Sequence, residues 1–519
     1  MWFRVAQFAP SPSPSLADGG GGVRRYATKI AFAIVLLTSC FVEAQETEAK
    51  SFQEVLAVVE WTPQRFGQFK DDEPFNSASQ AELARLLLRL QAIPPAKLSA
   101  WAQRGNDIES LAAAPTDHRG ELLHLTGKVV GVSEQRLEVA AAAALEQPNW
   151  NVCEIRLDRG ETVEVISRTI PEAWSKLSPL DEPVVCDAVF VRRTETGDDR
   201  GRLQFVAPHI AWYPTQPDPP TVNFGMATLG SLGVDMAQWQ SIQRAGSLTG
   251  QDFTAFYQTL AAMRKVDAGQ LIKLARSNLE GYAQPYRDEL SKLDDDTARA
   301  TRRGAILREI VTTADEGRFS VWPLFLEASD QRGQLVVLTG VVRRAVRVDT
   351  SIDREGAASD ALNRFGIDHY YELEMFTEDS QNKPLVFCVL ELPAGFPTGD
   401  DLHESVRMAG FLFKIWSYRG RRPTDESPDT SAAAHDAREA APLLIGRGPL
   451  RIETSADAPS SWAKGVMGSL LALAIGSFWF VVWWFSRGDK HFEKTTLAKL
   501  TSPPQPLRIE VPEIHENDE

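Results

Sequence analysis

The sequence predicts an α+β protein built from two copies of one unit, in which a helical segment precedes a small β-barrel. The phrase DHRGELLHLTG at residues 117–127 returns as DQRGQLVVLTG at residues 330–340. Self-similarity over such a spacing indicates that one structural unit is used twice. Segments rich in β-branched and aromatic residues follow the phrase in both copies, and helical stripes of apolar residues precede it. A long apolar run near the C-terminus adds one transmembrane helix to this prediction.

The strands predicted after the first phrase are bounded by Gly, Pro and Asp, as strand ends commonly are. They are Leu122–Val132, Val152–Leu157, Thr162–Ile170, Pro183–Arg193 and Leu203–Trp212. Their counterparts in the second copy are Leu335–Val348, Tyr370–Phe376, Leu385–Leu392, Val406–Tyr418 and Leu443–Ile452. We expect the dipeptides Ala207-Pro208 and Ala441-Pro442 to match before the last strand of each copy.

A glycine near the middle of each long first strand, Gly127 or Gly340, would let that strand bend and pair on both sides of a closed barrel. Five strands, a short helical piece between the third and the fourth, and a final strand with an Ala-Pro dipeptide resemble the OB-fold. The resemblance covers about 100 residues of each copy, the size of a typical small domain. An SH3-like barrel or a small β-sandwich is the alternative.

The order of these segments divides the chain into domains. We expect helical units at residues 50–110 and 225–325, and barrels at 117–214 and 330–455. The second helical unit carries an insertion of about 40 residues relative to the first, which suggests two further helices. Within the second barrel, the charged and Pro-rich stretch from Arg419 to Ala440 is predicted to be a mobile loop.

Residues 1–44 are predicted to be a disordered start followed by a secretory signal peptide. Three basic residues precede the apolar run Ile30–Val42, which is too short to span a bilayer. Cleavage after Ala44 is the preferred interpretation, and lipidation of Cys40 in a lipobox-like sequence is the alternative. Val23 is a second candidate for the true start of the protein.

The run Gly465–Phe485 carries no charge, and as a helix it would reach about 30 Å, the thickness of a hydrocarbon core. Trp479, Trp483 and Trp484 gather near its C-terminal end, where indoles favour the membrane interface. Basic residues follow this run more densely than they precede it. The positive-inside rule therefore predicts a disordered cytoplasmic tail at 486–519 and extracytoplasmic barrels. The expected location is the cytoplasmic membrane, spanned once.

Three small residues at four-residue spacing, Gly468, Ala472 and Gly476, share one face of this helix. Such a face lets two membrane helices approach closely, which suggests a homodimer. The alternative is that small residues are simply common in membrane helices.

The composition and the motifs exclude several classes of function. A net charge of −15 argues against non-specific nucleic-acid binding, which needs a broad positive field. No nucleophile elbow, phosphate-binding loop, dinucleotide fingerprint or zinc-protease motif occurs, so we expect no cofactor and no metal and cannot assign a catalytic residue. His118 and His124 are interpreted as surface or structural histidines; because their counterparts are Gln331 and Val337, a ligand role in the first copy alone is the alternative. Cys153, Cys186 and Cys388 are expected to be buried thiols, and a Cys153–Cys186 disulfide is the alternative.

One segment could bind a ligand. The fourth strand of the second copy ends with Trp416 and Tyr418 on one face, and Arg419, Arg421 and Arg422 open the loop that follows. OB-folds bind oligomers with that loop and its neighbouring strands, by stacking on aromatic rings and by neutralising charge. The favoured alternative is that Trp416 and Tyr418 pack against the preceding helices.

The sequence therefore predicts a membrane-anchored extracytoplasmic protein that binds or scaffolds an envelope protein or polymer, with the lipid bilayer as a further partner. Its layout resembles that of signal-bearing, single-pass envelope proteins of planctomycete-type bacteria with OB-like domains. The alternatives are an envelope enzyme whose site lies between domains, and a binder of anionic polymer or nucleic acid through the second barrel.

Overall fold

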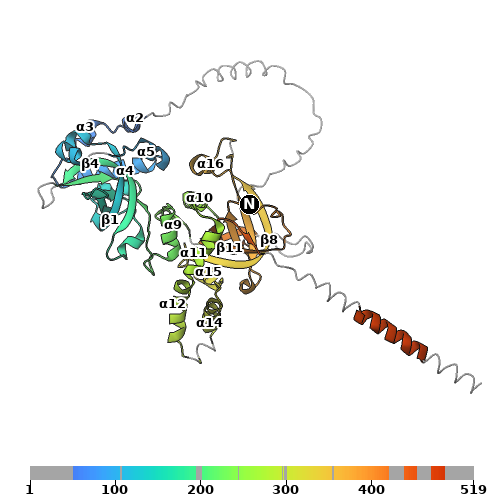
Figure 1. The fold of residues 1–519 in the computed structure, drawn as a ribbon. Helices are drawn as coiled ribbons and strands as arrows, with labels where there is room; N and C mark the ends of the chain where they lie inside the picture. Colours follow the sequence, from blue (N-terminus) through green and yellow to red (C-terminus); the bar gives the residue numbers. More distant parts are fainter. Residues whose placement is uncertain are drawn as a thin grey trace, which may run out of the picture. The chain divides into compact units, whose positions relative to one another are not determined.

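The computed structural model describes residues 51–105, 108–194, 201–243, 245–294, 296, 301–353, 356–419, 438–452 and 469–484. The described residues up to Ile452 belong to one compact unit, and the helix at 469–484 belongs to a second. The first unit is a mixed α+β structure with two sheets, so the predicted fold class is confirmed at that level (Figure 1).

The strands of the first sheet pair in a ring. They are β1 (Leu122–Arg136), β2 (Asn149–Leu157), β3 (Thr162–Ser167), β4 (Glu182–Thr194) and β5 (Arg202–Val206). The order is β1-β2-β3-β5-β4, and β4 pairs back to β1. Only the β3–β5 pair in this ring is parallel. A short strand, β6 (Ala211–Trp212), extends the sheet beside β4.

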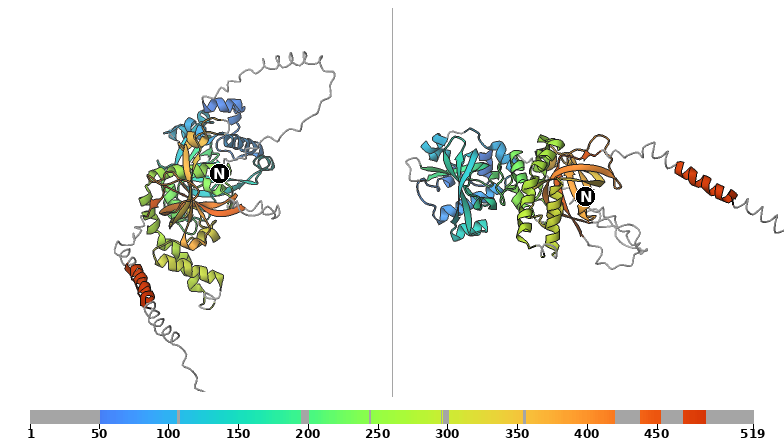
Figure 2. Two further views of the ribbon diagram at one scale, coloured as in Figure 1. Left: turned by 90° about the vertical axis from the view of Figure 1, so that its right-hand side faces the viewer. Right: turned by 60° about the horizontal axis from the view of Figure 1, so that its bottom comes forward.

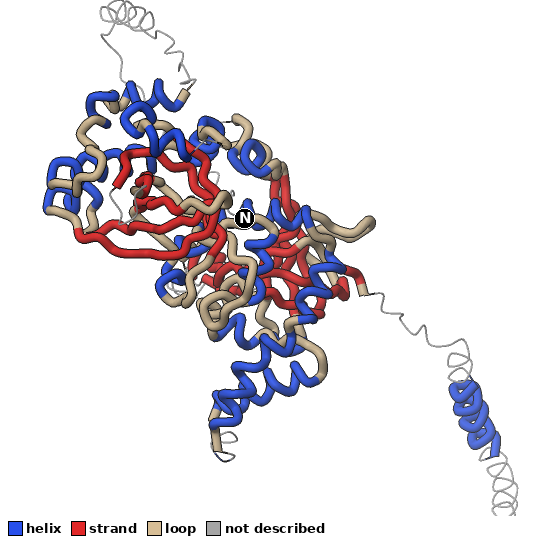
Figure 3. The backbone as a smooth tube through the Cα atoms, turned by 60° about the vertical axis from the view of Figure 1, so that its left-hand side comes forward, coloured by secondary structure: helices blue, strands red, loops and turns tan. Residues whose placement is uncertain are grey.

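The second sheet repeats this order. Its ring consists of β8 (Leu335–Asp349), β9 (His369–Phe376), β10 (Leu385–Val389), β11 (Glu404–Arg419) and β12 (Arg438–Gly446). The β10–β12 pair is parallel, and β13 (Leu450–Arg451) lies beside β11 as β6 lies beside β4. This pairing fits the OB-like prediction for both copies. Figure 2 shows the first barrel in teal and green and the second in yellow to orange, and Figure 3 shows the two groups of strands in red.

Irregularities in the two barrels occupy equivalent positions. A bulge interrupts β1 between Val129 and Gly131, and another interrupts β8 between Val342 and Arg344. A second pair of bulges lies between Phe190 and Arg192 in β4 and between Leu412 and Lys414 in β11. Bulges bend a strand and increase its twist, which a closed barrel requires.

Gly127 and Gly340 are required because the neighbouring strand leaves no space for a side chain, and not only because glycine lets a strand bend. A Cβ atom at Gly127 would collide with the backbone carbonyl of Arg156 on β2, and one at Gly340 would collide with that of Phe376 on β9. The neighbouring backbone therefore excludes any side chain at this point of the first strand in both barrels.

The predicted match between Ala207-Pro208 and Ala441-Pro442 is wrong in register. Ala441 and Pro442 lie inside β12, where they pair with Trp416 and Ile415 of β11, whereas Ala207-Pro208 follows the end of β5. The hydrogen-bonded register instead aligns Val206 with Ile445, because each pairs with the equivalent residue of the long fourth strand. A shared dipeptide is a weaker guide than a ladder of backbone pairs.

Helices precede, interrupt and follow the barrels. Their bounds are α2 Phe52–Val58, α3 Pro63–Phe66, α4 Ser77–Gln91, α5 Pro95–Trp101, α6 Ile108–Ala113, α7 Pro115–His118, α8 Val139–Leu145, α9 Phe224–Ser231, α10 Phe253–Ala262, α11 Ala268–Ser277, α12 Leu279–Lys292, α14 Arg302–Asp315, α15 Trp322–Leu326 and α16 Asp360–Phe365. Four short 3-10 helices are η1 Glu172–Ser175, η2 Gln238–Ser241, η3 Met263–Lys265 and η4 Glu378–Ser380.

Several helices begin at side-chain caps that the sequence supplies. Asn76 accepts a hydrogen bond from the backbone N–H of Ser79 at the start of α4, and Asp267 forms a capping box with Gln270 at the start of α11. The insertion in the second copy is the helical pair α12 and α14 (Figure 1), which has a small apolar core of its own.

One buried cation attaches each barrel to its preceding helical unit. Arg192 follows the β4 bulge, donates to the backbone carbonyl of Glu73 and to Gln204, and lies over the ring of Phe75. Lys414 occupies the same place in β11 and donates to the carbonyl of Ser247, which follows β7 (Ala245–Gly246). In both copies, the same position of the fourth strand therefore binds the segment just before a helix. That helix is α4 in the first copy and α10 in the second.

The C-terminal predictions lie mostly outside the described residues. Residues 469–484 of the predicted span 465–485 are helical. Among the residues that the structure describes, no helix combines the length and the hydrophobicity needed to cross a membrane. Residues 1–44, the flanking Gly465, Gly468 and Phe485, and the tail 486–519 lie outside the described part. The prediction of buried thiols is confirmed for Cys153, Cys186 and Cys388, which are free and buried.

Candidate functional site

The aromatic–arginine segment predicted in the second barrel is only partly described. Trp416 is 5% exposed and belongs to the apolar core, so its ring offers no open face on which a base or sugar could stack. Tyr418 and Arg419 pair with Glu439 and Arg438 at the end of β11, but Arg421 and Arg422 lie outside the described residues. Ligand binding by this loop therefore stays a prediction.

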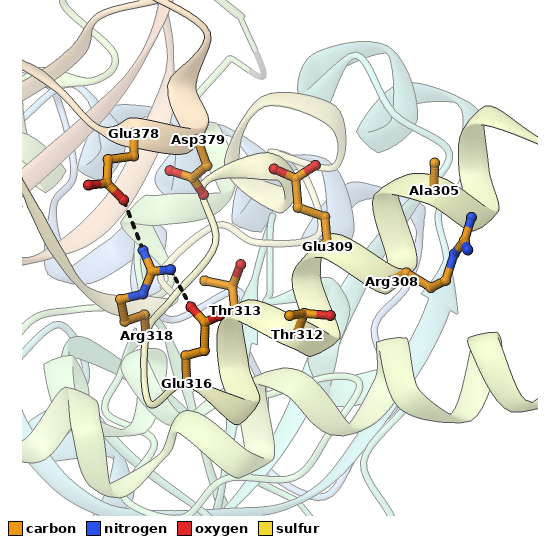
Figure 4. Close-up of a pocket in the computed structure, with 9 residues that line it drawn as sticks. All are labelled: Ala305, Arg308, Glu309, Thr312, Thr313, Glu316, Arg318, Glu378 and Asp379. Carbon is orange, nitrogen blue, oxygen red and sulfur yellow. Dashed lines mark hydrogen bonds and ion pairs between the residues drawn. The ribbon is translucent and has the colours of Figure 1, made fainter. Parts of the chain in front are cut away.

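One hollow lies between α14 and η4 (Figure 4). Its volume is about 480 Å³, and its walls carry four carboxylates and two arginines. Arg318 points between Glu316 and Glu378 and forms ion pairs with both. Asp379 accepts hydrogen bonds from the backbone of Val321 and from Thr377. Arg318 and Asp379 thus join α14, the segment that follows it and η4, which favours a structural role for this hollow.

A second cavity, of about 600 Å³, lies beside the first barrel. Its volume falls in the usual range of small-molecule sites. Its walls come from α4 and α5, from β1, β4 and β6 of the barrel, from the loop after β5, and from the end of α16. They are Leu90, Gln91, Ile93, Pro95, Ala96, Leu98, Ser99, His124, Val185, Cys186, Asp187, Pro208, His209, Ala211, Tyr213, Asn363, Arg364 and Phe365. We call it the barrel-1 cavity.

A His–Asp pair on the barrel wall faces this cavity. His124 on β1 and Asp187 on β4 are direct partners in the antiparallel ladder, so their side chains share one face of the sheet. His124 Nδ1 lies 2.7 Å from Asp187 Oδ1. Because an ionised carboxylate only accepts hydrogen bonds, Nδ1 carries the proton and Nε2 remains for another partner.

A second His–Asp pair lies in the loops after the barrel. His209 Nε2 is 2.5 Å from Oδ2 of Asp235, which is only 4% exposed. The other carboxylate oxygen accepts from the backbone N–H groups of Trp212 and Ala237, which fixes the orientation of Asp235. Burial lowers the pKa of His209, but the hydrogen bond and the charge of Asp235 outweigh it, so the pKa lies above its ordinary value.

Tyr213 adds a phenol to the cavity wall. Burial, helped by the charges of Asp235 and Asp187, raises the pKa of Tyr213 to about 12, so its phenol stays protonated at neutral pH. The neighbouring Cys186 is buried, and burial raises the pKa of its thiol, which removes it as a nucleophile. Across the described ranges, no group of three or more His, Cys, Asp or Glu side chains could hold a metal ion.

Sequence reasoning assigned His124 to a structural role and did not consider His209. The partner of His124 lies on another strand, so no local spacing could reveal the pair. The signal that could have found it is the repeat itself. The ladder of the second barrel pairs Val337 with Ala409 where the first pairs His124 with Asp187. The second copy has apolar residues where the first has a polar pair. The pair is therefore not required by the fold and is a candidate for a function of the first barrel alone.

Comparisons with known proteins add little. No family model and no curated protein matches the chain. Two solved structures are weakly similar. The aspartyl-tRNA synthetase of Entamoeba histolytica is 11% identical with a TM-score of 0.16, and the match covers 60% of this chain and 54% of that one. A protein described as an aspartyl-tRNA synthetase from Leishmania major Friedlin is 10% identical with a TM-score of 0.16, covering 62% and 52%.

The chain thus spans about half the length of the solved structures that it matches. At these TM-scores the similarity supports no inference about fold or function.

Proposed function

We propose that the chain is a membrane-tethered binding protein of the bacterial envelope, which displays two OB-like barrels outside the cytoplasm and holds a ligand in the barrel-1 cavity. The binding part rests on one observation: two His–Asp pairs and a tyrosine converge on an apolar-walled cavity. Apolar walls with a few oriented polar groups are the usual composition of a ligand site. An envelope protein or polymer is the expected partner of the barrels.

The tether is supported by the uncharged run 465–485. Within it, the described helix 469–484 has apolar side chains around its whole circumference and no charged residue. A short helix of this kind is stable only when apolar surroundings cover it. Basic residues follow the run, which favours a cytoplasmic tail and extracytoplasmic barrels.

Cell fractionation tests the tether. We expect the full chain to stay with membranes after washing with alkaline carbonate, and a protease added outside the cytoplasmic membrane to cleave the barrels but spare the tail. Leu473→Arg combined with Phe480→Arg should release the protein, whereas Leu473→Ile with Phe480→Leu should not. Release of the unaltered chain by carbonate would contradict the tether.

Crosslinking in intact cells tests the binding role. Mass spectrometry of the purified full chain should identify a reproducible partner or polymer fragment. We expect this material to decrease when His209→Leu alters the cavity and to remain in a control, His118→Gln. His118 pairs with Glu121 and does not line the cavity. Recovery of the protein without associated material would contradict the scaffolding part of the proposal.

The orientation of His124 favours a second candidate, an acid–base enzyme. With Nδ1 bonded to Asp187, Nε2 has the position that a general base requires. Hydrolysis of nitrophenyl acetate by the full chain tests this function. An enzyme should exceed the rate of free imidazole and lose the excess in His124→Gln, while a binding protein should show no excess rate.

A further inference from the structure

We infer that the barrel-1 cavity takes a small organic anion with an apolar body, such as an aryl or alkyl carboxylate, held by the protonated imidazoles of His124 and His209 and the guanidinium of Arg364. This inference rests on the proposed function and names the chemistry of its ligand. It depends on the groups that line the cavity, on how their donors are engaged, and on the comparison between the two barrels.

The cavity wall combines apolar and polar side chains. Leu90, Ile93, Pro95 and Leu98 come from α4, α5 and their connection, and Phe365 adds an aromatic ring from the end of α16. The basic side chains come from β1, from the loop after β5 and from α16. A ligand that fills this space must therefore carry an apolar body and a polar end.

The basic side chains that line the cavity outnumber its carboxylates. Arg364, His124 and His209 line the wall together with one carboxylate, Asp187, while Asp235 bonds to His209 from outside the lining. His124 bonds to Asp187 through Nδ1, so its Nε2 donates to a ligand when the imidazole is protonated. The ion pair from Arg364 to Asp360 is long, at 3.9 Å, and Asp360 is 71% exposed, so this contact holds the guanidinium weakly. The N–H groups of Arg364, His124 and His209 that face the cavity would donate to an anionic ligand.

The second barrel indicates that the fold does not need these groups. Its register places Val337 where the first barrel has His124 and Ala409 where it has Asp187. His209 corresponds to Gly448, because Ala211 and Leu450 pair with equivalent residues of the long fourth strand. Partly buried polar pairs contribute little stability over apolar pairs of similar shape. A ligand explains why the first barrel has them.

Calorimetric titration of the full chain in lipid nanodiscs tests the inference, with empty nanodiscs subtracted. The probes are naphthylacetate and its neutral amide, naphthylacetamide, which differ at the polar end alone. We expect the carboxylate to bind about 10-fold more tightly or better, because charge-assisted hydrogen bonds are roughly twice as strong as neutral ones. The combined variant His124→Val with Asp187→Ala, and separately His209→Leu and Arg364→Gln, should reduce the preference. His118→Gln should preserve it.

The outcomes separate this inference from the proposed function. Equal binding of the acid and the amide would overturn the anion inference while the cavity kept its ligand role. Binding of neither probe would overturn the cavity as a site for such molecules. Preference for the acid that survives all three cavity variants, each with an unchanged circular dichroism spectrum, would place the anion elsewhere and also overturn the inference. Membrane attachment is measured independently by fractionation.

Discussion

The two barrels share their architecture and differ in their chemistry. Both have the same strand order, the same two bulges, a glycine without room for a side chain, and a buried cation after the second bulge. They differ where the first barrel places His124 against Asp187 and the second places Val337 against Ala409. The shared features identify what the fold requires, and the differences show where function can reside.

The buried cations extend the comparison to energetics. Lys414 and Asp252 form an ion pair 3.0 Å long, and their side chains are 0% and 1% exposed. Arg192 instead has neutral hydrogen-bond partners and an aromatic ring, and burial lowers its pKa to about 10. One copy thus compensates a buried cation with a carboxylate, and the other with backbone, amide and ring.

The largest expected effect comes from breaking the ion pair of the second barrel. Lys414→Met leaves the carboxylate of Asp252 buried without its cation, which should lower the free energy of unfolding by roughly 3–5 kcal/mol. Arg192→Met leaves no buried carboxylate without a cation, so it should lower the free energy of unfolding by less, about 1–3 kcal/mol. Urea denaturation of the full chain in nanodiscs measures both.

The double variant Lys414→Met with Asp252→Leu is the control for that prediction. Because it removes both charges, it should recover most of the loss. If the single and the double variant are equally destabilised, packing of the lysine stem and not the ion pair holds this position.

The next effect concerns the glycines of the first strands. Gly127→Ala and Gly340→Ala force a Cβ atom against a neighbouring carbonyl, which should cost about 1–3 kcal/mol in each barrel. Gly250→Ala is the matched control, since nothing lies within 4 Å of its added carbon and its backbone is not in the left-handed region. Thermal unfolding compares the three. Equal tolerance at all three positions would show that the strands move apart easily.

Transplanting the apolar pair of the second barrel into the first should change stability little. His124→Val with Asp187→Ala replaces both members of a partly buried polar pair, and such double replacements shift the free energy of unfolding by about 1 kcal/mol or less. Asp187→Ala alone should be worse, because it leaves His124 without its acceptor. A double variant less stable than the single one would mean that the polar pair is structural.

The smallest effect is a pH dependence of stability from His209. The second barrel has Gly448 at the equivalent position and therefore has no imidazole there. The pKa of His209 in the folded chain lies above the ordinary 6.5, so folding favours the protonated imidazole. Its contribution to stability is complete below pH 6.5 and is lost as the pH rises through the folded pKa. As the pH rises through this window, the unfolding temperature of the unaltered chain should therefore fall. The unfolding temperature of His209→Gln should fall less. Parallel curves would contradict the pairing with Asp235.

The sequence predicts the long strands of the second barrel closely because their β-branched runs are local signals. The predicted Leu335–Val348 and Val406–Tyr418 correspond to β8 and β11 within two residues at either end. The predicted last strands are wrong as single strands, because Leu203–Trp212 divides into β5 and β6, and Leu443–Ile452 begins inside β12 and continues into β13. The helices α8 and α16, inserted between the first two strands of each barrel, escaped prediction because they are short. α8 consists largely of alanine and packs on α4. Burial in the folded chain, not propensity, decides such helices.

The candidate site could not be predicted in the same way. His124 and Asp187 are brought together by strand pairing, and His209 and Asp235 by a loop that returns after α9, so no motif spacing connects them. The predicted ligand segment around Trp416 rests on aromatic and arginine residues that are close together in the sequence. The structure shows that this indole is buried in the core, and burial depends on the whole fold, whereas Arg421 and Arg422 lie outside the described residues.

Photolabelling is the most direct test of the central claim that the first barrel has a ligand site which the second lacks. A diazirine derivative of naphthylacetate would be activated by light on the full chain in nanodiscs, and the labelled peptides would be mapped by mass spectrometry. The predicted result is labelling of the cavity wall, at 90–99 and 208–213, that excess naphthylacetate suppresses and that His209→Leu reduces. Suppressible labelling confined to the second barrel, at 335–349 or 404–419, would contradict the claim.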